Sequence, residues 1–326
     1  IRYCLLSRGL GDVYKRQEEA FKRINTGGYQ IYTTVDLEMQ KYVEEKYSDL
    51  NNLMDAESNS TWVDEDEDGE YEQLYPESAF IAMDYNGNIL SIAGGIGVKE
   101  KLLIFNRATM AKRQPGSCIK PITTYGLALY SDHIHWGSMY KDSPIKLEGE
   151  KWPENYDYVW RGYNMFIFEA LRESRNTVPA QLCQELTPQA VFNFATQNLN
   201  VDLVDITEEG ATDIAYAPLT VGALTYGISP QNLVNAYLPY GNGGTYCDAH
   251  IVSRVERGDG SVVYENDGNP HEAVDPETAY VMNHLLQEVV KNGTGTAAQL
   301  SNKTVAGKTG TSEDWNDLCF VGLTED

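Results

Sequence analysis

Short runs of β-branched and aromatic residues, bounded by turn residues, predict several strands in the first third of the chain. Residues 30–35 form one such run, and Asp36 after them predicts the cap of a helix that extends to about Tyr47. Residues 78–95 predict a hairpin, because two β-rich runs flank Asn86-Gly87. That residue pair is favoured in type I′ turns.

Helix signals dominate the middle of the chain. We expect a helix to begin near Ser117, where Pro121 is tolerated because the first amides of a helix have no intrahelical acceptor. Residues 229–240 predict a second helix, with serine as its cap and proline at its first position. Residues 275–292 begin with Asp-Pro and end before a glycine, which predicts a long helix.

The end of the chain adds two strand pairs. Residues 249–265 predict a hairpin that turns at 258–260, and residues 303–311 and 317–323 predict two adjacent strands. Hairpins and long helices mixed in this order indicate an α+β fold. In such a fold the helices pack on a largely antiparallel sheet.

Size and charge restrict the function classes. The chain has 326 residues, enough for one large core or for one domain with a smaller appendage. Its formal net charge of −23 argues against nucleic acid as a partner, because phosphate binding needs clustered Lys and Arg. No run reaches the roughly 18 apolar residues of a membrane helix. Any membrane anchor would therefore lie upstream of this sequence.

The cysteine and histidine positions predict neither a disulfide framework nor a metal site. The cysteines are Cys4, Cys118, Cys183, Cys247 and Cys319. They form no C-x-x-C pair, so we interpret them as small core residues and leave the redox compartment open. His133 and His135 form an H-x-H pair, but no further spacing completes a set of metal ligands. We expect no metal and no cofactor.

Composition divides the chain into four segments. Residues 1–17 carry four basic residues and one acidic residue, a net charge of +3, and resemble a translated sequencing-adapter scar. We exclude them from the fold. Residues 18–54 are predicted to be a linker and the start of the main region, and residues 55–77 an acidic surface insertion. Residues 78–326 are predicted to form the main domain, incomplete at its C-terminus.

The acidic insertion contains one motif that resembles a metal site. From Asp64 it reads D-x-D-x-D-G, as an EF-hand calcium loop begins. The twelfth position is Tyr75 rather than glutamate, and no pair of predicted helices frames the loop. We therefore interpret the insertion as a solvated acidic segment.

Three S-x-x-K motifs occur, at residues 117–120, 138–141 and 143–146. In the third, Pro144 biases Ser143 toward extended backbone, so its serine and lysine would point to opposite faces. The same proline leaves the second copy barely one helical turn, which predicts a loop. In the first copy, Ser117 and Lys120 would share a helix face. A lysine is a base only if burial or a nearby cation lowers its pKa, so the alternative is a helix-capping serine beside a solvated lysine.

Two further motifs follow in order along the chain. Residues 174–176 read S-R-N, and residues 308–310 read K-T-G, followed by Thr311. Each taken alone is compatible with an ordinary turn or strand end. Together with the first S-x-x-K motif they form the set of penicillin-binding proteins and serine β-lactamases. The hydroxyl and amide of S-x-N can relay protons, and K-T-G-T offers a cation and hydroxyls to a carboxylate.

From about Gly27 to the end, the chain resembles the transpeptidase region of a class A (bifunctional) penicillin-binding protein. The matching stretches are "GGYQIYTTVDLEMQ", "FNRATMAKRQPGSCIKPI", "WPENYD", "EALRESRNTVPAQL", "LTYGISPQNLVNAYLPYGNGGTY", "LLQEVVKNGTGTAAQL" and "VAGKTGTSEDWNDLCFVGLTED". The "IYTTVD" stretch is typical of bifunctional members, which favours them over β-lactamases and small carboxypeptidases. The resemblance implies the fold shared by penicillin-binding transpeptidases and serine β-lactamases, an antiparallel sheet flanked by helices.

The resemblance also implies catalytic roles. Ser117 would attack the carbonyl between two D-alanines of a peptidoglycan stem peptide, and Lys120 would take its proton. Ser174, with Asn176 beside it, would return a proton to the leaving D-alanine, while Lys308 would support the electrostatics. The acyl group would then pass to an amine of a neighbouring stem.

Further residues would bind substrate. The hydroxyls of Thr309 and Thr311 would hold the terminal carboxylate, and Gly310 would let the substrate backbone pack close. The backbone amides of Ser117 and Thr311 would form an oxyanion hole. A β-lactam, which mimics D-Ala-D-Ala, would leave Ser117 stably acylated.

The sequence departs from the family at several points. Cys118 and Ile119 follow the serine where the family more often has a small polar residue and an aromatic. We interpret Cys118 as a core residue, with a reactive thiol as the alternative. Cys319 stands where the family usually has tryptophan, which would reshape the floor of the active site. The glycosyltransferase domain and membrane anchor typical of this class are not in the sequence, and the closing strand and helix are missing. We interpret the chain as a fragment of a protein on the outer face of the cytoplasmic membrane.

Three functions from different classes stay open on sequence grounds. The first is a crosslinking transpeptidase. The second is an acyl-serine enzyme that uses water, either a D,D-carboxypeptidase or a β-lactamase, although no motif nominates a carboxylate for deacylation. The third is a non-catalytic β-lactam sensor or scaffold. Stem peptides and β-lactams are the expected ligands, with envelope or division proteins as further partners.

Overall fold

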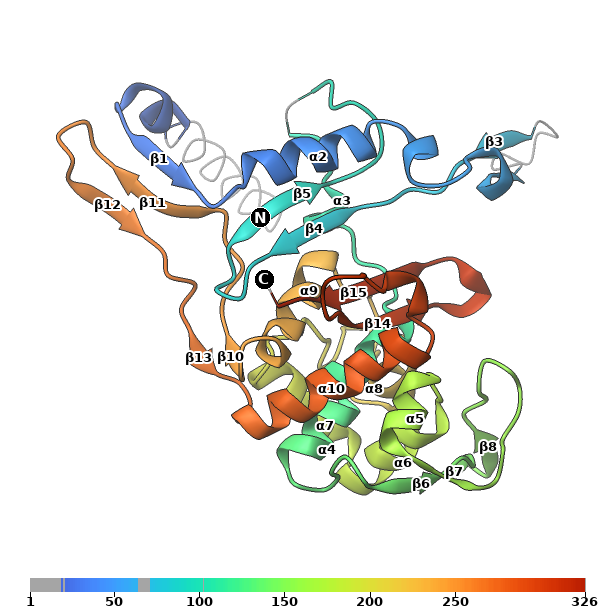
Figure 1. Ribbon diagram of the computed structural model, residues 1–326. Coiled ribbons are helices and arrows are strands. Elements are labelled where there is room, and N and C mark those ends of the chain that lie inside the picture. Colours follow the sequence, from blue (N-terminus) through green and yellow to red (C-terminus); the bar gives the residue numbers. More distant parts are fainter. Residues whose placement is uncertain (1–18, 20, 64–70, 102, 326) are drawn as a thin grey trace, which may run out of the picture.

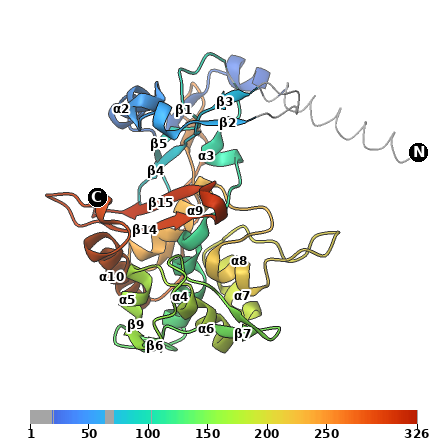
Figure 2. The same ribbon diagram turned by 90° about the vertical axis from the view of Figure 1, so that its right-hand side faces the viewer.

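The computed structural model describes residues 19, 21–63, 71–101 and 103–325. Two sequence predictions concern residues outside the described ranges. They are the adapter-like segment 1–17 and the D-x-D-x-D-G motif at 64–69. Figure 1 shows an N-terminal layer above a larger, mainly helical body. The turned view in Figure 2 shows the same two parts.

The N-terminal layer combines one long helix with short strand pairs. Its elements are β1 (Gln30–Thr33), α2 (Leu37–Tyr47), the 3₁₀ helices η1 (Leu50–Asn52) and η2 (Glu57–Asn59), β2 (Thr61–Val63), β3 (Glu72–Leu74), β4 (Phe80–Met83) and β5 (Ile89–Ala93). The side chain of Asp36 accepts hydrogen bonds from the amides of Glu38 and Met39, so the predicted cap is confirmed. Helix α2 packs on β5.

The predicted acidic insertion, residues 55–77, carries regular structure of its own. Strands β2 and β3 within it pair antiparallel, with Trp62 opposite Gln73. Trp62 and the neighbouring Tyr71 are exposed. That this segment is an insertion into the family's fold stays a prediction.

The hairpin predicted at residues 78–95 is confirmed, but its turn differs from the prediction. Strands β4 and β5 pair antiparallel, with a register shift between Ala82 and Met83. A type I′ turn needs positive φ at both central residues. Gly87 has φ 80, whereas Asn86 is not among the residues with positive φ. The side chain of Asp84 instead accepts from the amides of Asn86 and Asn88, which stabilises a longer turn.

Helices build the larger body. They are α3 (Arg107–Met110), η3 (Gly116–Ile122), α4 (Thr124–Tyr130), α5 (Ile167–Arg172), α6 (Thr177–Leu186), α7 (Pro188–Gln197), α8 (Tyr216–Val221), α9 (Pro230–Tyr237), η4 (Leu238–Tyr240), α10 (Pro276–Asn292), η5 (Thr296–Ala298) and η6 (Glu313–Trp315). Ser229 and Asp275 cap α9 and α10 as predicted. Buried residues of η3, α4, α6 and α10 meet in one hydrophobic core.

The remaining strands are short. They are β6 (Met139–Lys141), β7 (Ile145–Leu147), β8 (Glu150–Trp152), β9 (Asn164–Phe166), β10 (Thr245–Tyr246), β11 (Val252–Glu256), β12 (Val262–Glu265), β13 (His271–Glu272), β14 (Ala306–Thr311) and β15 (Leu318–Leu323). Strand β11 joins β1 to β12 in a three-stranded sheet. The second S-x-x-K motif ends in β6, so its prediction as a loop was wrong. The pairing of β6 with β9 holds those residues extended.

Strands β14 and β15 form the hairpin around which the site is built. They pair antiparallel, with Gly310 opposite Cys319 and Lys308 opposite Val321. Helix α10 packs on β14, and so does η3. Every strand pair in the described part of the chain is antiparallel. The predicted α+β class, with helices against antiparallel strands, is confirmed.

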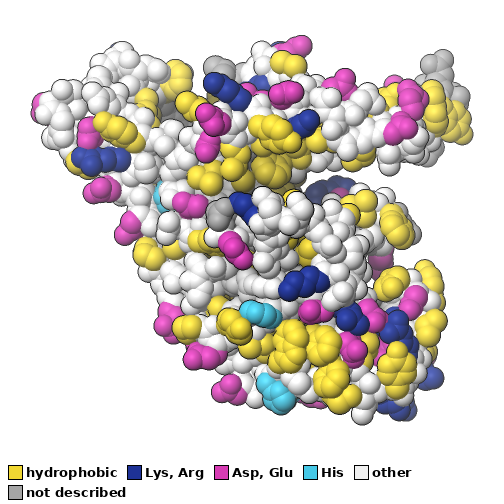
Figure 3. Space-filling view, viewed as in Figure 1, with side chains coloured by type: hydrophobic (Ala, Val, Ile, Leu, Met, Phe, Trp, Pro, Cys, Tyr) yellow, Lys and Arg dark blue, Asp and Glu magenta, His cyan; other side chains and the backbone are white. Residues whose placement is uncertain are grey.

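Acidic side chains are widely distributed on the face of the molecule that Figure 3 presents. They lie over both the N-terminal layer and the helical body. Among the described residues, no helix has the length and apolar character that crossing a membrane requires.

Candidate active site

The start of η3 is fixed by contact between three backbones. Gly116 has φ 51, which favours glycine, and a Cβ at this position would overlap the carbonyl of Thr311. Gly222, at the end of α8, has φ 79, and a Cβ there would overlap the carbonyl of Gly116. The segment before Ser117 is therefore held between the end of β14 and the end of α8. This contact brings the predicted nucleophile beside Thr311.

Lys120 is fully buried and points into the S-x-N loop. Its Nζ donates to Ser174 O at 2.8 Å, to Arg175 O at 3.1 Å and to Asn176 Oδ1 at 2.7 Å. In a 3₁₀ helix, residues three apart are eclipsed, so Ser117 and Lys120 do share a face. The Ser117 hydroxyl, however, is not among the hydrogen-bond partners of Lys120.

Ser174 joins the motifs through its hydroxyl. Lys308 Nζ donates to Ser174 Oγ at 2.9 Å, and Lys120 Nζ lies 3.5 Å from the same oxygen. Ser174 has φ 56, in the left-handed region that a residue with a side chain rarely adopts. Such conformations persist where the surrounding structure over-determines them, and they cluster at functional sites.

Burial of both amines lowers their proton affinity. Burial, and then the positive charge of Lys308, lowers the pKa of Lys120 well below its ordinary value. Burial likewise lowers the pKa of Lys308 to about 8. Burial thus favours the neutral form of Lys120, which is the form that can accept a proton, although its three acceptors match a protonated amine.

The K-T-G-T strand presents two different faces. Lys308 and Gly310 are buried, while Thr309 is half-buried and Thr311 is exposed, as the two-residue period of a strand requires. The hydroxyls of Thr309 and Thr294 lie 2.6 Å apart. Thr294 belongs to none of the sequence motifs, and nothing in its local pattern indicates a contact with a strand residue fifteen positions later.

A buried ion cluster supports the S-x-N loop. Arg175 is fully buried, and its Nη1 lies 2.7 Å from Asp157 Oδ1, while its Nη2 lies 3.3 Å from Asp142 Oδ2. Asp142, also fully buried, accepts from Thr177 Oγ1 at 2.7 Å and from Asn155 Nδ2 at 3.0 Å. A buried charge is tolerated only when it is paired. Arg175 Nη1 donates to both carboxylate oxygens of Asp157, whereas its Nε and Nη2 are paired with Glu173 and Asp142 without a hydrogen bond.

Asn155 extends this support to the S-x-N motif itself. Its Oδ1 accepts from the amide of Asn176 at 2.8 Å, and Asn176 Nδ2 donates to Glu154 O at 2.7 Å. The "WPENYD" stretch thus holds the S-x-N loop in place. The resemblance to the family includes this stretch but implies no role for it.

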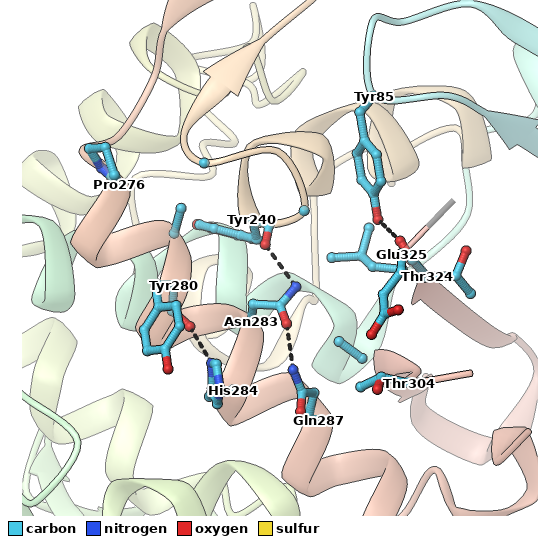
Figure 4. Close-up of a pocket in the computed structure, with 15 residues that line it drawn as sticks. Tyr85, Tyr240, Pro276, Tyr280, Asn283, His284, Gln287, Thr304, Thr324 and Glu325 are labelled. Carbon is cyan, nitrogen blue, oxygen red and sulfur yellow. Dashed lines mark hydrogen bonds between the residues drawn. The ribbon is translucent and has the colours of Figure 1, made fainter. Parts of the chain in front are cut away.

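Two hollows lie near these elements. One, of about 370 Å³, is lined by Lys112, Arg113 and Gln114 on one side and by Ser312, Glu313, Asn316 and Asp317 on the other. It adjoins the start of η3 and the end of β14. The other, of about 360 Å³, lies between α10 and the end of β15, with Tyr280, His284 and Gln287 along the helix (Figure 4). None of the predicted site residues lines the second cavity.

The structure brings the three motifs together. Hydrogen bonds join Lys120, Ser174, Asn176 and Lys308 directly. Ser117 is placed beside them through the backbone contact of Gly116 with Thr311. The other two S-x-x-K copies lie outside this cluster, on the strands and loops around β6 and β7.

Comparison with known proteins agrees with this geometry. Residues 78–324 match the family described as "Penicillin binding protein transpeptidase domain". Penicillin-binding protein 1A of Clostridium botulinum (strain Langeland) is 32% identical over 311 residues, which cover 91% of this chain and 35% of that protein. Penicillin-binding protein 4 of Bacillus subtilis is 29% identical over 314 residues, covering 95% of this chain and 46% of that protein.

Solved structures share the fold. The PonA1 protein of Mycobacterium tuberculosis, in complex with penicillin V, superposes with a TM-score of 0.72 at 22% identity, covering 98% of this chain and 79% of that one. The D,D-transpeptidase domain of a peptidoglycan glycosyltransferase from Eggerthella lenta gives a TM-score of 0.66 at 19% identity, covering 91% and 75%.

The chain spans about a third of the length of its first curated relatives. The family match, by contrast, runs through most of the chain and includes all three motifs. The protein therefore belongs to the penicillin-binding protein transpeptidase family.

Proposed function

We propose that this chain is the part of a peptidoglycan crosslinking enzyme that carries out D,D-transpeptidation through an acyl-enzyme on Ser117. One observation carries the proposal most directly: two buried lysines from different motifs lie 2.9 and 3.5 Å from the hydroxyl of Ser174. Family membership supports the same reaction class.

The first half of the reaction is acylation. Ser117 Oγ attacks the carbonyl carbon between two D-alanines, and its proton passes to the neutral amine of Lys120. Lys120 Nζ donates to three acceptors of the S-x-N loop, as a protonated amine does, so Lys120 must first lose a proton and turn toward Ser117. Catalytic hydrogen bonds often tighten only when substrate is present.

Charge develops on the carbonyl oxygen as Ser117 attacks. The backbone amides of Ser117 and Thr311 are the candidates to stabilise it, since the Gly116 contact places these two segments together. Each such donor is typically worth ~3 kcal/mol in the transition state. The Ser174 hydroxyl, in reach of both lysines, then relays a proton to the amine of the leaving D-alanine, with Asn176 holding Lys120 in place.

Substrate binding rests on the exposed face of β14. Thr311 is free to meet the terminal carboxylate, and Thr309 would do so together with Thr294, to which its hydroxyl bonds. Lys308 supplies positive charge behind them, and Gly310 lets the substrate backbone approach. In the second half of the reaction, an amine of a neighbouring stem attacks the acyl-enzyme and forms the crosslink.

The proposal also covers the location, domain arrangement and ligands of the whole protein. We place it outside the cytoplasm, where peptidoglycan is assembled, and expect a class A arrangement with a glycosyltransferase region and an anchor elsewhere in the protein. Several relatives are named penicillin-binding proteins, and one structural neighbour is described with penicillin V. We therefore propose β-lactams as ligands of Ser117, and envelope or division proteins as further partners.

The test is labelling with a fluorescent penicillin, followed by intact mass measurement over time. Ser117→Ala should abolish labelling. Ser143→Ala, in the third S-x-x-K copy, is the matched control and should label like the unchanged chain. Circular dichroism establishes that each variant is folded.

Three outcomes separate the rival functions. A lasting adduct on the unchanged chain, absent from Ser117→Ala, supports the penicillin-binding assignment. Crosslinking then needs a stem-peptide assay with an added amine, because a carboxypeptidase would release D-alanine without joining stems. Rapid loss of the adduct with hydrolysis of the drug would instead indicate a β-lactamase. A folded chain that never labels would overturn the acyl-serine mechanism.

A further inference from the structure

Two cysteines meet directly below the candidate active site. The Sγ atoms of Cys118 and Cys319 lie 3.2 Å apart, although the residues are 201 positions apart in the chain. Cys118 follows the nucleophile on η3, and Cys319 is on β15, opposite Gly310 of the K-T-G motif. Cys118 is fully buried, and Cys319 is partly exposed.

The two thiols fit together because Gly310 leaves room for them. A Cβ on Gly310 would lie 2.6 Å from Cys319 Sγ and 3.0 Å from Cys118 Sγ, so no larger residue is compatible with this packing. Cys118 Sγ also lies 3.2 Å from Lys308 O, and Cys319 Sγ lies 3.2 Å from Pro115 O. Both sulfurs are therefore in contact with the segments that carry Ser117 and Lys308.

The two thiols differ in how easily they ionise. The contact with Cys118, and then the charge of Lys308, lowers the pKa of the Cys319 thiol despite its burial. Burial, and then the contact with Cys319, raises the pKa of Cys118. The thiolate is the reactive form of cysteine. Cys319, the more exposed of the two, is thus also the better nucleophile.

We propose that Cys118 and Cys319 form an oxidisable thiol pair, which peroxide converts to a disulfide that slows acylation of Ser117. Formation of the disulfide is argued from the sulfur geometry alone. Its effect on the acylation of Ser117 rests on the proposed function. In the family, a tryptophan usually stands at the position of Cys319. The resemblance implies no chemical role for either cysteine.

The chemistry requires only a small oxidant. The Cys319 thiolate attacks hydrogen peroxide, breaks its O–O bond and becomes a sulfenic acid, with release of one water after protonation. The Cys118 sulfur then attacks the Cys319 sulfur and displaces the second water. The net reaction oxidises two thiols to one disulfide and reduces one peroxide to two waters. Cys319 is the partly exposed residue of the pair, so a molecule as small as peroxide would approach from its side.

The disulfide would change the geometry above it. A sulfur–sulfur bond is about 2.05 Å long, so sulfurs now 3.2 Å apart must move together by more than 1 Å. That movement pulls η3 against the β14–β15 hairpin, the two elements that supply the candidate oxyanion amides. Displacements of this size can cost about 100-fold in rate. We expect acylation at least about tenfold slower in the oxidised chain.

The experiment treats the purified chain with hydrogen peroxide, blocks free thiols and maps the peptides by mass. A crosslinked pair of peptides containing Cys118 and Cys319 is expected, and a reductant should dissociate it. Cys118→Ala and Cys319→Ala should each abolish the crosslink. Cys247→Ala, at a buried thiol elsewhere, is the matched control and should leave the crosslink unchanged. The same samples are then labelled with fluorescent penicillin, with and without the reductant.

The outcomes distinguish this proposal from the proposed function. Oxidation of Cys319 to sulfinic acid without a crosslink overturns the thiol pair, as does a crosslink to another cysteine. A crosslink that leaves the labelling rate unchanged overturns the effect on Ser117. A reduced chain that is folded but never labels refutes the acyl-serine mechanism, while the peptide map still decides on the disulfide. Slow labelling after oxidation, restored by the reductant, supports both parts.

Discussion

Lys308 Nζ lies 2.9 Å from the Oγ of Ser174, a residue 134 positions earlier in the chain. Lys120 Nζ approaches the same oxygen to 3.5 Å. A single hydroxyl therefore connects the S-x-x-K, S-x-N and K-T-G motifs. Because the hydroxyl can accept from one amine while donating toward another group, it is suited to move a proton rather than only to hold the loop.

Replacing Ser174 should separate its chemical role from its conformational strain. Ser174→Ala and Ser174→Gly both remove the hydroxyl, so both should lower the rate of acylation by about 100-fold, as for loss of a positioned proton-transfer group. Only glycine is free of strain at φ 56. Ser174→Gly should therefore be about 1 kcal/mol more stable than Ser174→Ala in urea unfolding.

The comparison between these two variants is its own control, since they differ by one methyl group. Equal stability would mean that the backbone relaxes out of the left-handed region. Unchanged acylation in both variants would rule out the proton relay through Ser174.

The acylation rate should first rise and then fall as the pH increases. The rate rises as pH increases through the lowered pKa of Lys120, because only the neutral amine accepts the proton of Ser117. It falls again as pH increases through about 8, because Lys308 then loses its charge. The measurement is the labelling rate with a fluorescent penicillin across the pH range.

Lys308→Arg tests the assignment of the upper limb. An arginine stays protonated throughout this range, so the fall near pH 8 should disappear in that variant. A folded Lys308→Arg chain that keeps the same upper limb would assign the limb to another group.

Breaking the buried ion cluster should destabilise the chain. Asp142→Ala leaves Arg175, which is fully buried, with fewer partners and removes the acceptor of Thr177 and Asn155. Loss of one member of a buried pair costs about 3 kcal/mol or more. The measurement is the free energy of unfolding in urea.

The exposed ion pair of Lys112 and Asp202 is the control for the buried cluster. Asp202→Ala should change the unfolding free energy by less than about 1 kcal/mol, as is usual for surface pairs. Similar losses in both aspartate variants would contradict the supporting role inferred for Asp142.

A methyl group at Gly310 should disrupt the site from below. In Gly310→Ala the new Cβ would overlap the carbonyl of Pro115 and crowd both active-site thiols. Overpacking of this kind typically costs about 1–3 kcal/mol, and penicillin labelling should weaken as β14 shifts. Gly137→Ala is the control, because its Cβ would meet nothing closer than 3.5 Å. Full labelling by Gly310→Ala would show that β14 and η3 need not pack this closely.

Local signals in the sequence predicted a large part of this structure. The caps at Asp36, Ser229 and Asp275 were correct, because a cap depends on residues within one helical turn. The β14–β15 pair was correct for the same reason, since the two strands are close in sequence. The motif order predicted which lysines and serine would meet, although only through the resemblance to a known family.

Contacts between distant segments could not be predicted in this way. Nothing local indicates that Arg175 pairs with Asp142 and Asp157, since the partners lie on separate loops and share no period. The Cys118–Cys319 contact, 201 residues apart, is hidden for the same reason. The type I′ turn was wrong because the side chain of Asp84 stabilises a longer turn that residue pairs alone do not reveal.

The backbone contact of Gly116 with Thr311 has a consequence for biosynthesis. A ribosome makes the nucleophile long before the strand that completes it, as Cys118 precedes its neighbour Lys308 by 190 residues. In the proposed mechanism, Ser117 lacks the amide of Thr311 and the amine of Lys308 until the β14–β15 hairpin has been translated and has packed against η3. The proposed mechanism therefore predicts that a nascent chain cannot acylate Ser117 before β14 has folded against η3.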